Sequence, residues 1–157
     1  MDDSERKYFS EIITNKISQM RSLNKNGYTI SSKKFDVSRI SGEDWYDLIL
    51  SNNNNRELRI SFYFDNGGGM SLVIYRPKDK AYISGSYNSL SLNDYIRKNK
   101  LDYSHCLKWE GSKETLERKI ESSLSCLENL FLKDKKIADV LLGEDWVNIE
   151  PVWYQYK

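Results

Sequence analysis

The chain has 157 residues, of which 39% are hydrophobic and 30% are charged, and its formal net charge is +1. This composition argues against a disordered chain and against a basic tail that binds nucleic acid. The length suits one domain over residues 1–157 with a substantial core. Residues 1–13 contain early acids and no apolar core, and no apolar run is long enough for a membrane span. We therefore expect a cytoplasmic protein whose partner is neither a membrane nor a nucleic acid.

The N-terminal quarter predicts one long helix followed by an extended segment. The helix covers residues 4–23, with Ser4 as its N-cap and Gly27 in its stop signal. Its apolar residues recur at spacings of three and four and form one stripe: Phe9, Ile12, Ile13, Ile17 and Met20. Residues 28–40 contain two alternating sets that are out of phase, which predicts a bulge or loop near residues 31–34.

The centre of the chain predicts an antiparallel meander over residues 45–85. Residues 45–51 form its first strand. Residues 56–76 form a hairpin in which apolar and polar residues alternate on both sides of a turn. The apolar members of the hairpin are Leu58, Ile60, Phe62, Phe64, Met70, Leu72 and Ile74. The turn contains the glycines at 67–69, and glycine supplies the positive φ that a chain reversal needs. A further strand is predicted over residues 80–86.

The C-terminal half predicts mainly helices. Ser91 opens a short helix over residues 92–98, and residues 101–110 are a strand or an extended edge.

The second long helix has Ser112 as its predicted N-cap. Its apolar residues again recur at three and four: Leu116, Ile120, Leu124, Leu127, Leu130 and Phe131. A break at residues 133–135 precedes a shorter helix over residues 136–142. Residues 146–156 are predicted to form an edge strand or a strand end, since the proline among them lacks a backbone donor.

Together these elements predict an α+β domain. We expect an antiparallel sheet of four to six strands, with the N-terminal helix and the C-terminal helices packed on its apolar face. The expected oligomeric state is a monomer or a weak homodimer.

His105 is the single histidine, and it stands beside Cys106. A zinc site needs three or four ligands, and the sequence has no second histidine and no paired-cysteine motif. Neighbours in an extended segment point to opposite sides, so these two residues do not form a Cys–His pair, although Cys126 could approach His105 in space. Two cysteines do not make a disulfide framework, and we expect both to be reduced and buried. We expect no catalytic residue, no metal and no cofactor.

The tetrapeptide GEDW occurs twice, at residues 42–45 and 143–146. One interpretation is a turn that leads into an extended segment. The other is two matched acidic and aromatic corners on one face, where acids steer a basic partner and tryptophan anchors it. The candidate partner-binding residues are Glu43, Asp44, Trp45, Asp47, Glu144, Asp145 and Trp146.

Eleven tyrosines and four tryptophans supply further candidate contact area. Tyr63 and Tyr75 lie on the hairpin face opposite the core residues, where they are either exposed or buried under a second layer. With Arg56, Arg59 and Arg76 this face could stack single-stranded RNA, but the chain has no RNA-binding motif and no basic excess.

Three segments mark the order of helices and strands along the chain: NGGG at 66–69, SLNDYI at 91–96 and LLGEDWVNI at 141–149. With them, the chain resembles small bacterial immunity proteins, which neutralise toxins delivered between cells. The resemblance implies an N-terminal helix, an antiparallel meander and C-terminal helices, and it implies a cognate toxin as the partner. It assigns no role to an individual residue.

The first hypothesis is therefore a non-enzymatic protein that binds a cognate toxin domain and covers its functional surface. One alternative is a small enzyme in which His105 and a carboxylate form an acid–base pair in a cleft. Another is a regulatory domain that self-associates through an exposed edge strand, such as the C-terminal one.

Overall fold

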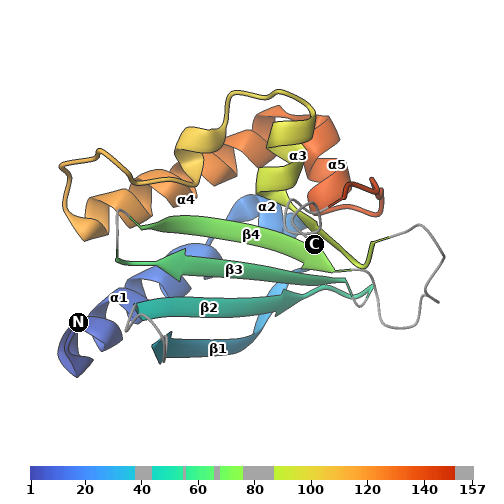
Figure 1. The fold of residues 1–157 in the computed structure, drawn as a ribbon. Coiled ribbons are helices and arrows are strands. Elements are labelled where there is room, and N and C mark those ends of the chain that lie inside the picture. Colours follow the sequence, from blue (N-terminus) through green and yellow to red (C-terminus); the bar gives the residue numbers. More distant parts are fainter. Residues whose placement is uncertain (38–43, 55, 66–67, 76–86, 151–157) are drawn as a thin grey trace.

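The computed structural model describes residues 1–37, 44–54, 56–65, 68–75 and 87–150 (Figure 1). Its helices are α1 (Asp3–Ser18), α2 (Arg21–Lys25), α3 (Leu92–Lys98), α4 (Leu116–Lys133) and α5 (Lys135–Leu141), with a 3₁₀ turn, η1, at Ser104–Cys106. Its strands are β1 (Thr29–Val37), β2 (Asp44–Ser51), β3 (Glu57–Tyr63), β4 (Gly69–Tyr75) and β5 (Ser89–Ser91). Within these ranges no helix combines the length and the apolar character that crossing a membrane requires.

The five strands form one antiparallel sheet in chain order, β1-β2-β3-β4-β5. In Figure 1, α1 and α2 lie behind this sheet. The Tyr46 hydroxyl of β2 is hydrogen-bonded to Thr14 of α1 at 2.9 Å. Ser123 of α4 accepts a hydrogen bond from Trp109, whose ring packs against Phe62 of β3. The α+β class, with helices on one face of an antiparallel sheet, is confirmed.

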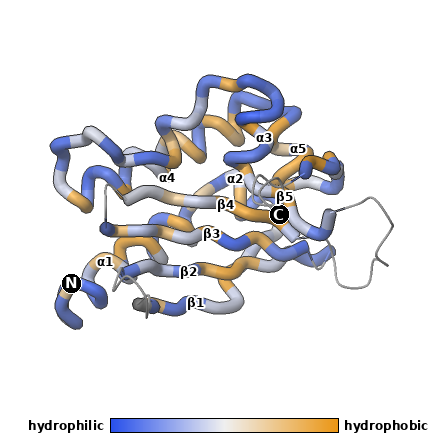
Figure 2. The backbone as a smooth tube through the Cα atoms, in the orientation of Figure 1, coloured by the Kyte–Doolittle hydropathy of each residue, from blue (hydrophilic) through white to orange (hydrophobic). Residues whose placement is uncertain are grey.

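The face under the helices is the apolar one, because burial alternates along the strands with a period of two. Figure 2 shows the resulting mixture of apolar and polar residues along each strand. The buried apolar residues of the three central strands are Tyr46, Leu48, Leu50, Leu58, Ile60, Phe62, Met70, Leu72 and Ile74. They form one core with Ile13 and Ile17 of α1 and with Ile120, Leu124 and Leu127 of α4.

The first helix differs from the prediction at both ends. Asp2, not Ser4, is the N-cap: its carboxylate accepts from the Glu5 backbone N–H at 2.8 Å, and the Glu5 side chain accepts from the Asp2 N–H. Ser4 cannot form this reciprocal capping box, because the third residue after it is Lys7. The helix stops at Ser18 and α2 follows separately, so the predicted single helix over residues 4–23 is wrong.

The C-terminal helices were predicted well in extent but not at every cap. Thr115, rather than Ser112, caps α4 by accepting a hydrogen bond from the Arg118 backbone N–H at 3.4 Å. Asp134 both ends α4 and caps α5, so the predicted break at residues 133–135 is confirmed.

The strand predictions are confirmed in the central hairpin and at the bulge. The register of β1 against β2 shifts between Ile30 and Ser32, at the start of the predicted irregular stretch. The predicted strand over 80–86 lies outside the described residues, as does the 151–156 part of the predicted C-terminal strand. Residues 146–150 contain no strand.

The expectation of two reduced cysteines is wrong for this structure. Cys106 of η1 forms a disulfide with Cys126 of α4, and the two Cα atoms are 5.5 Å apart. The fold places η1 against α4, which brings the two residues into bridging range. The link joins residues 20 apart. Closing a loop of this size restricts the unfolded chain and contributes about 3 kcal/mol.

Gly69 begins β4 at the point where the chain after η1 meets the sheet. The Met70 backbone N–H donates to the Leu107 carbonyl at 2.8 Å. A Cβ atom on Gly69 would collide with the same carbonyl oxygen, and the φ of Gly69 is +156°. This close approach of two backbones requires glycine.

We predict that Gly69→Ala lowers the free energy of unfolding by about 2 kcal/mol, because the added methyl group must displace the Leu107 carbonyl from β4. Urea unfolding measures the loss. Gly111→Ala is the matched control, since Gly111 has a φ of +79° but nothing within 4 Å of an added Cβ. Its conformational cost alone is about 1 kcal/mol. Equal losses in the two variants would contradict the steric explanation.

Tyr28, just before β1, has a buried hydroxyl with no hydrogen-bond partner among the described residues. Burial raises its pKa from 10.0 to about 12, against the opposing effect of Arg56. The folded chain thus holds Tyr28 neutral at a pH at which the unfolded chain ionises it. The resulting stability is fully present below pH 10 and is lost as the pH rises to about 12.

We predict that Tyr28→Phe becomes more stable relative to the wild type between pH 10 and 12, by roughly 2–3 kcal/mol across the interval. The measurement is the difference in unfolding free energy between the two proteins at each pH, in which the titration of other groups cancels. A difference that does not change with pH would contradict the prediction.

Candidate functional site

The candidate site is the side of the sheet that faces away from the helices. Its residues alternate with the core residues of β2, β3 and β4 and line a shallow hollow of about 400 Å³. These residues, termed the open face, are Trp45, Asp47, Arg59, Ser61, Tyr63, Ser71, Val73 and Tyr75. No described element covers them (Figure 1).

The strand register brings the open face together from three strands. Trp45 of β2 lies opposite Tyr63 of β3, and Asp47 lies opposite Ser61. Arg59 of β3 lies opposite Val73 of β4. Directly opposed side chains on one face are close enough to contact each other, so the aromatic and polar groups form one surface.

A hydrogen-bonded pair of side chains orients Trp45. Its indole Nε1 donates to one carboxylate oxygen of Asp47 at 3.1 Å, and the Ser61 hydroxyl donates to the other oxygen. Both oxygens of Asp47 are therefore engaged within the open face. The acid next to the tryptophan fixes the ring, which reduces the conformational entropy that binding would remove.

Arg59 lies beside this pair and stacks on a second aromatic ring. Its guanidinium carbon is 5.6 Å from the centre of the Tyr75 ring. Its Nε is shielded from solvent and has no hydrogen-bond partner in the described part of the chain. An arginine stacked on an aromatic ring is a common contact residue at protein interfaces.

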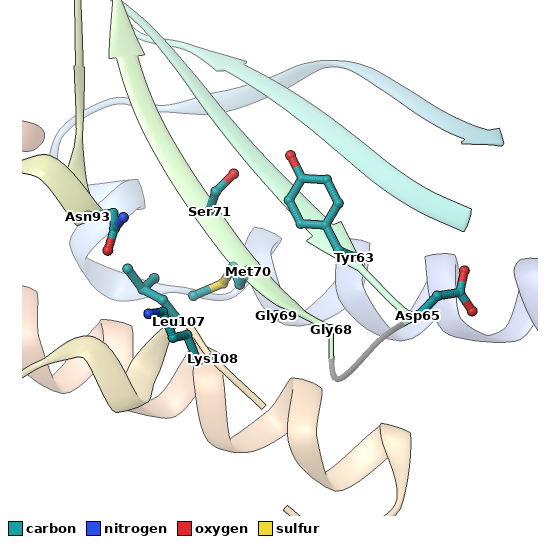
Figure 3. A pocket seen from close by; sticks show the side chains of 9 residues that line it. All are labelled: Tyr63, Asp65, Gly68, Gly69, Met70, Ser71, Asn93, Leu107 and Lys108. Carbon is teal, nitrogen blue, oxygen red and sulfur yellow. The ribbon is translucent and has the colours of Figure 1, made fainter. Parts of the chain in front are cut away.

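A second hollow, of about 390 Å³, adjoins the open face at the start of β4 (Figure 3). Tyr63 and Ser71 line both hollows, and the second one extends to Asn93 and Lys108. Tyr63 stands between them and is 46% exposed. In Figure 3 its ring projects away from the helices. The two hollows thus share one exposed aromatic side chain.

Of the predicted partner-binding residues, Trp45 and Asp47 lie on the open face. Glu43 lies outside the described residues. Asp44 points to the covered side and is only 4% exposed.

The buried carboxylate of Asp44 fastens α1 to β2. It is 3.1 Å from the Arg6 guanidinium and 3.3 Å from the α-amino group of Met1. The hydrogen bond from Arg6 to Asp44 raises the pKa of the Arg6 guanidinium. The carboxylate of Asp44 is therefore a structural group inside the protein.

The second acidic segment follows α5, where Glu144 and Asp145 are exposed and Trp146 is half-buried. The buried Arg56 holds this segment in place: its guanidinium donates to the carbonyls of Val140, Gly143 and Asp145. It also lies 5.6 Å from the centre of a Trp146 ring. A cation at the C-terminal end of a helix is favoured by the helix dipole. Arg56 is thus a structural residue rather than part of an aromatic sheet face.

The described part of the first GEDW segment, Asp44 and Trp45, does not form one surface with the second segment. The Asp44 backbone N–H donates to Asp65, next to the turn after β3. Glu144 instead accepts from Asn54, in the connection between β2 and β3. These contacts lie at opposite ends of β2, a strand of roughly 23 Å. The geometry does not support two matched corners, while partner binding by the exposed Glu144 and Asp145 stays a prediction.

The predicted partner-binding residues omit six residues of the open face: Arg59, Ser61, Tyr63, Ser71, Val73 and Tyr75. They could have been recognised from their positions in the sequence, since each alternates with a core residue of the hairpin. Residues in phase with one another along a strand point to the same face. The alternation that identified the core could therefore have identified the open face.

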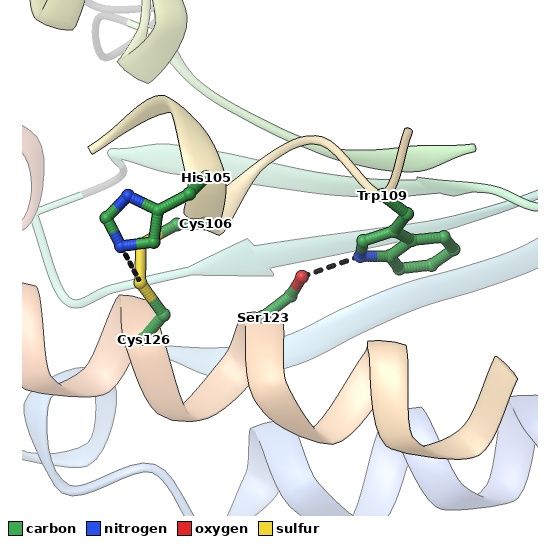
Figure 4. Close-up of a disulfide and its surroundings, with 5 residues drawn as sticks. All are labelled: His105, Cys106, Trp109, Ser123 and Cys126. Carbon is green, nitrogen blue, oxygen red and sulfur yellow. Dashed lines mark hydrogen bonds between the residues drawn. A yellow bond between two sulfur atoms is a disulfide. The ribbon is translucent and has the colours of Figure 1, made fainter. Parts of the chain in front are cut away.

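His105 lies on a different side of the molecule and is exposed (Figure 4). Its Nε2 is 3.6 Å from Cys126 Sγ. Among the described residues no carboxylate joins the cluster of His105, Cys106 and Cys126. The described hollows at the open face and at the start of β4 do not include His105 in their linings.

No protein-family model, curated protein or solved structure matches the chain. What the protein does must therefore be argued from its own fold and surfaces. The fold defines an α+β domain in which one face of the sheet is packed and the other carries ordered aromatic side chains.

We predict that Asp44→Asn lowers the free energy of unfolding by about 1–3 kcal/mol, because it weakens the buried hydrogen bonds that join α1 to β2. Urea unfolding measures the loss. Asp3→Asn is the matched control, since Asp3 also pairs with Arg6 but has a fully exposed side chain. Exposed pairs of this kind contribute little. A stable Asp44→Asn variant would show that the carboxylate is dispensable for the fold.

Proposed function

We propose that this protein is a non-enzymatic binding protein that holds a partner protein on its open face. The partner is proposed to be a cognate bacterial toxin domain, whose functional surface is covered in the cytoplasm. The observation that carries this proposal is the ordered set of Trp45, Tyr63, Tyr75 and Arg59 on the side of the sheet that the described helices leave exposed.

The residue types of the open face favour protein recognition. Tryptophan, tyrosine and arginine dominate the energetics of protein interfaces, because they combine a large contact area with a directional polar group. The partly exposed Ser71 lies among them, whereas Ser61 is buried beneath them. A mixture of tyrosine and serine is also typical of binding surfaces that adapt to a protein partner.

The open face is rigid, which lowers the entropic cost of binding. Its side chains project from the central strands of a sheet whose other face is packed against helices. Asp47 and Ser61 further restrict Trp45, and Tyr75 restricts Arg59. Less conformational freedom is therefore lost when a partner docks.

The charges of the open face favour short-range contacts with a partner over long-range electrostatic attraction. The open face carries one acid, Asp47, and one base, Arg59, and the chain as a whole is almost neutral. Strong steering of a highly charged partner is not expected from this balance. Affinity would come from desolvated aromatic side chains and from hydrogen bonds to Arg59.

The size of the face indicates that the partner also reaches the second hollow. The three strands that carry the open face, at about 4.8 Å spacing and roughly 23 Å in length, present on the order of 300 Å² in projection. A standard interface buries about 800 Å² on each partner. The hollow that Tyr63 shares, extending to Lys108, lies next to the open face and would supply part of the remaining area.

A toxin domain is the partner that the overall plan of the chain supports. The NGGG turn, the SLNDYI helix start and the LLGEDWVNI segment resemble small bacterial immunity proteins. Such proteins act by occlusion, which requires a firm surface and no reaction centre.

The test uses the toxin-like domain encoded beside this gene, with affinity measured by calorimetry. We predict that Tyr63→Ala and Arg59→Ala each weaken binding at least about 30-fold, the effect of losing a hot-spot residue. Tyr63 is exposed in the free protein, so its replacement leaves the core intact.

Tyr8→Ala is the matched control, because Tyr8 is 50% exposed but lies on α1, where its hydroxyl bonds Glu117 of α4. This variant should bind as the wild type does. Loss of binding with Tyr8→Ala, together with normal binding by Tyr63→Ala, would place the interface on the helices. Failure of the wild type to bind any toxin-like neighbour would remove the immunity function.

A further inference from the structure

We propose that the reduced form of this protein binds one zinc ion through Cys106, Cys126 and His105, and that the disulfide form does not. The three side chains offer two thiolates and one imidazole, the ligand types that Zn²⁺ prefers. In the described part of the chain their ligand atoms all lie within 4.8 Å of one another. This site is separate from the open face and independent of the toxin-binding proposal.

The spacing between His105 and Cys126 already suits a shared metal. Zn–S and Zn–N bonds of about 2.3 and 2.0 Å at tetrahedral angles place the two ligand atoms roughly 3.5 Å apart. The observed separation of His105 Nε2 and Cys126 Sγ is 3.6 Å. Figure 4 shows the imidazole nitrogen directed at the sulfur.

Cys106 needs only a small movement to join these two ligands. Two thiolates on one tetrahedral zinc ion are about 3.8 Å apart, so breaking the disulfide requires the sulfurs to separate by roughly 1.7 Å. The Cα atoms of Cys106 and Cys126 are 5.5 Å apart. Rotation of the two side chains can supply this separation without moving the backbone.

Contacts other than the disulfide keep the two cysteines close after reduction. Trp109 Nε1 donates to Ser123 of α4 at 2.7 Å, one turn of helix before Cys126 (Figure 4). The Leu107 carbonyl accepts from Met70 of β4 at 2.8 Å, and the Leu107 side chain is buried. The segment that carries His105 and Cys106 is thus fixed to both α4 and the sheet.

Reduction of the disulfide and binding of zinc form a balanced reaction when a dithiol is the reductant. The dithiol gives two electrons and two protons to the bond between Cys106 and Cys126 and becomes a disulfide itself. One Zn²⁺ then replaces the two thiol protons, which are released to solvent. Three protein ligands leave a fourth position for water, as in open zinc sites. Exposure of His105 gives the ion access from solvent.

The test titrates the full chain, without an affinity tag, with Co²⁺ as a spectroscopic substitute for Zn²⁺. After reduction and removal of the reductant without oxygen, we expect one Co²⁺ per chain. We also expect the visible bands of a tetrahedral site and a thiolate-to-metal charge-transfer band, and Zn²⁺ should displace the Co²⁺. The oxidised protein should show none of these signals.

His105→Gln should keep the charge-transfer band but bind Zn²⁺ at least about tenfold more weakly, since loss of even an outer-shell partner has this effect. Cys126→Ser should lose most of the band. Absence of charge transfer in the reduced wild type would overturn the proposal, and so would equal affinity in His105→Gln.

A second measurement covers the case in which reduction unfolds the chain. Near-ultraviolet circular dichroism of the reduced protein is recorded before and after Zn²⁺, because a metal that binds only the folded form stabilises it. Recovery of the folded signal, or a higher melting temperature, is expected. A reduced chain on which Zn²⁺ has no effect would also overturn the proposal.

Discussion

Burial of one face of the meander under α1 and α4 is the constraint on which the rest of the structure depends. Side chains alternate along a strand, so packing Leu48, Ile60 and Leu72 into the core leaves their neighbours on the opposite side. The register then sets these neighbours across from one another, as with Asp47 and Ser61. The open face is therefore a product of the core, and its chemistry depends only on which residue types occupy the remaining positions.

The sequence was sufficient for the parts of the fold that depend on local periodicity. The hairpin, the bulge in β1 and the Ser91 cap of α3 all arise from residues close together in the chain. Choices between neighbouring caps were harder, because Asp2 and Ser4 are both good candidates and a single side chain, that of Glu5, decides between them. The disulfide depends on η1 meeting α4, a tertiary contact that no local pattern encodes.

The same distinction explains what could be predicted of the candidate site. Trp45 and Asp47 were selected as an acidic and aromatic pair, and they do share one face. Asp44 was selected with them although neighbours along a strand point to opposite sides, and its role emerges only with Arg6, 38 residues away. Arg59 was noticed for its charge, but its stacking on Tyr75 depends on the pairing of β3 with β4.

The bulge in β1 has a further consequence. An open sheet has two lateral borders, at which a strand from another molecule can add. One border is formed by β5 and by the chain around Leu107, which lies against the start of β4. At the other border, the ladder of β1 is interrupted near Ser31 and followed by the exposed Lys33 and Lys34. An interrupted, positively charged border resists the incoming strand that would begin a fibril. The bulge and the lysines of β1 thus protect one border of a sheet that presents an aromatic plane to water.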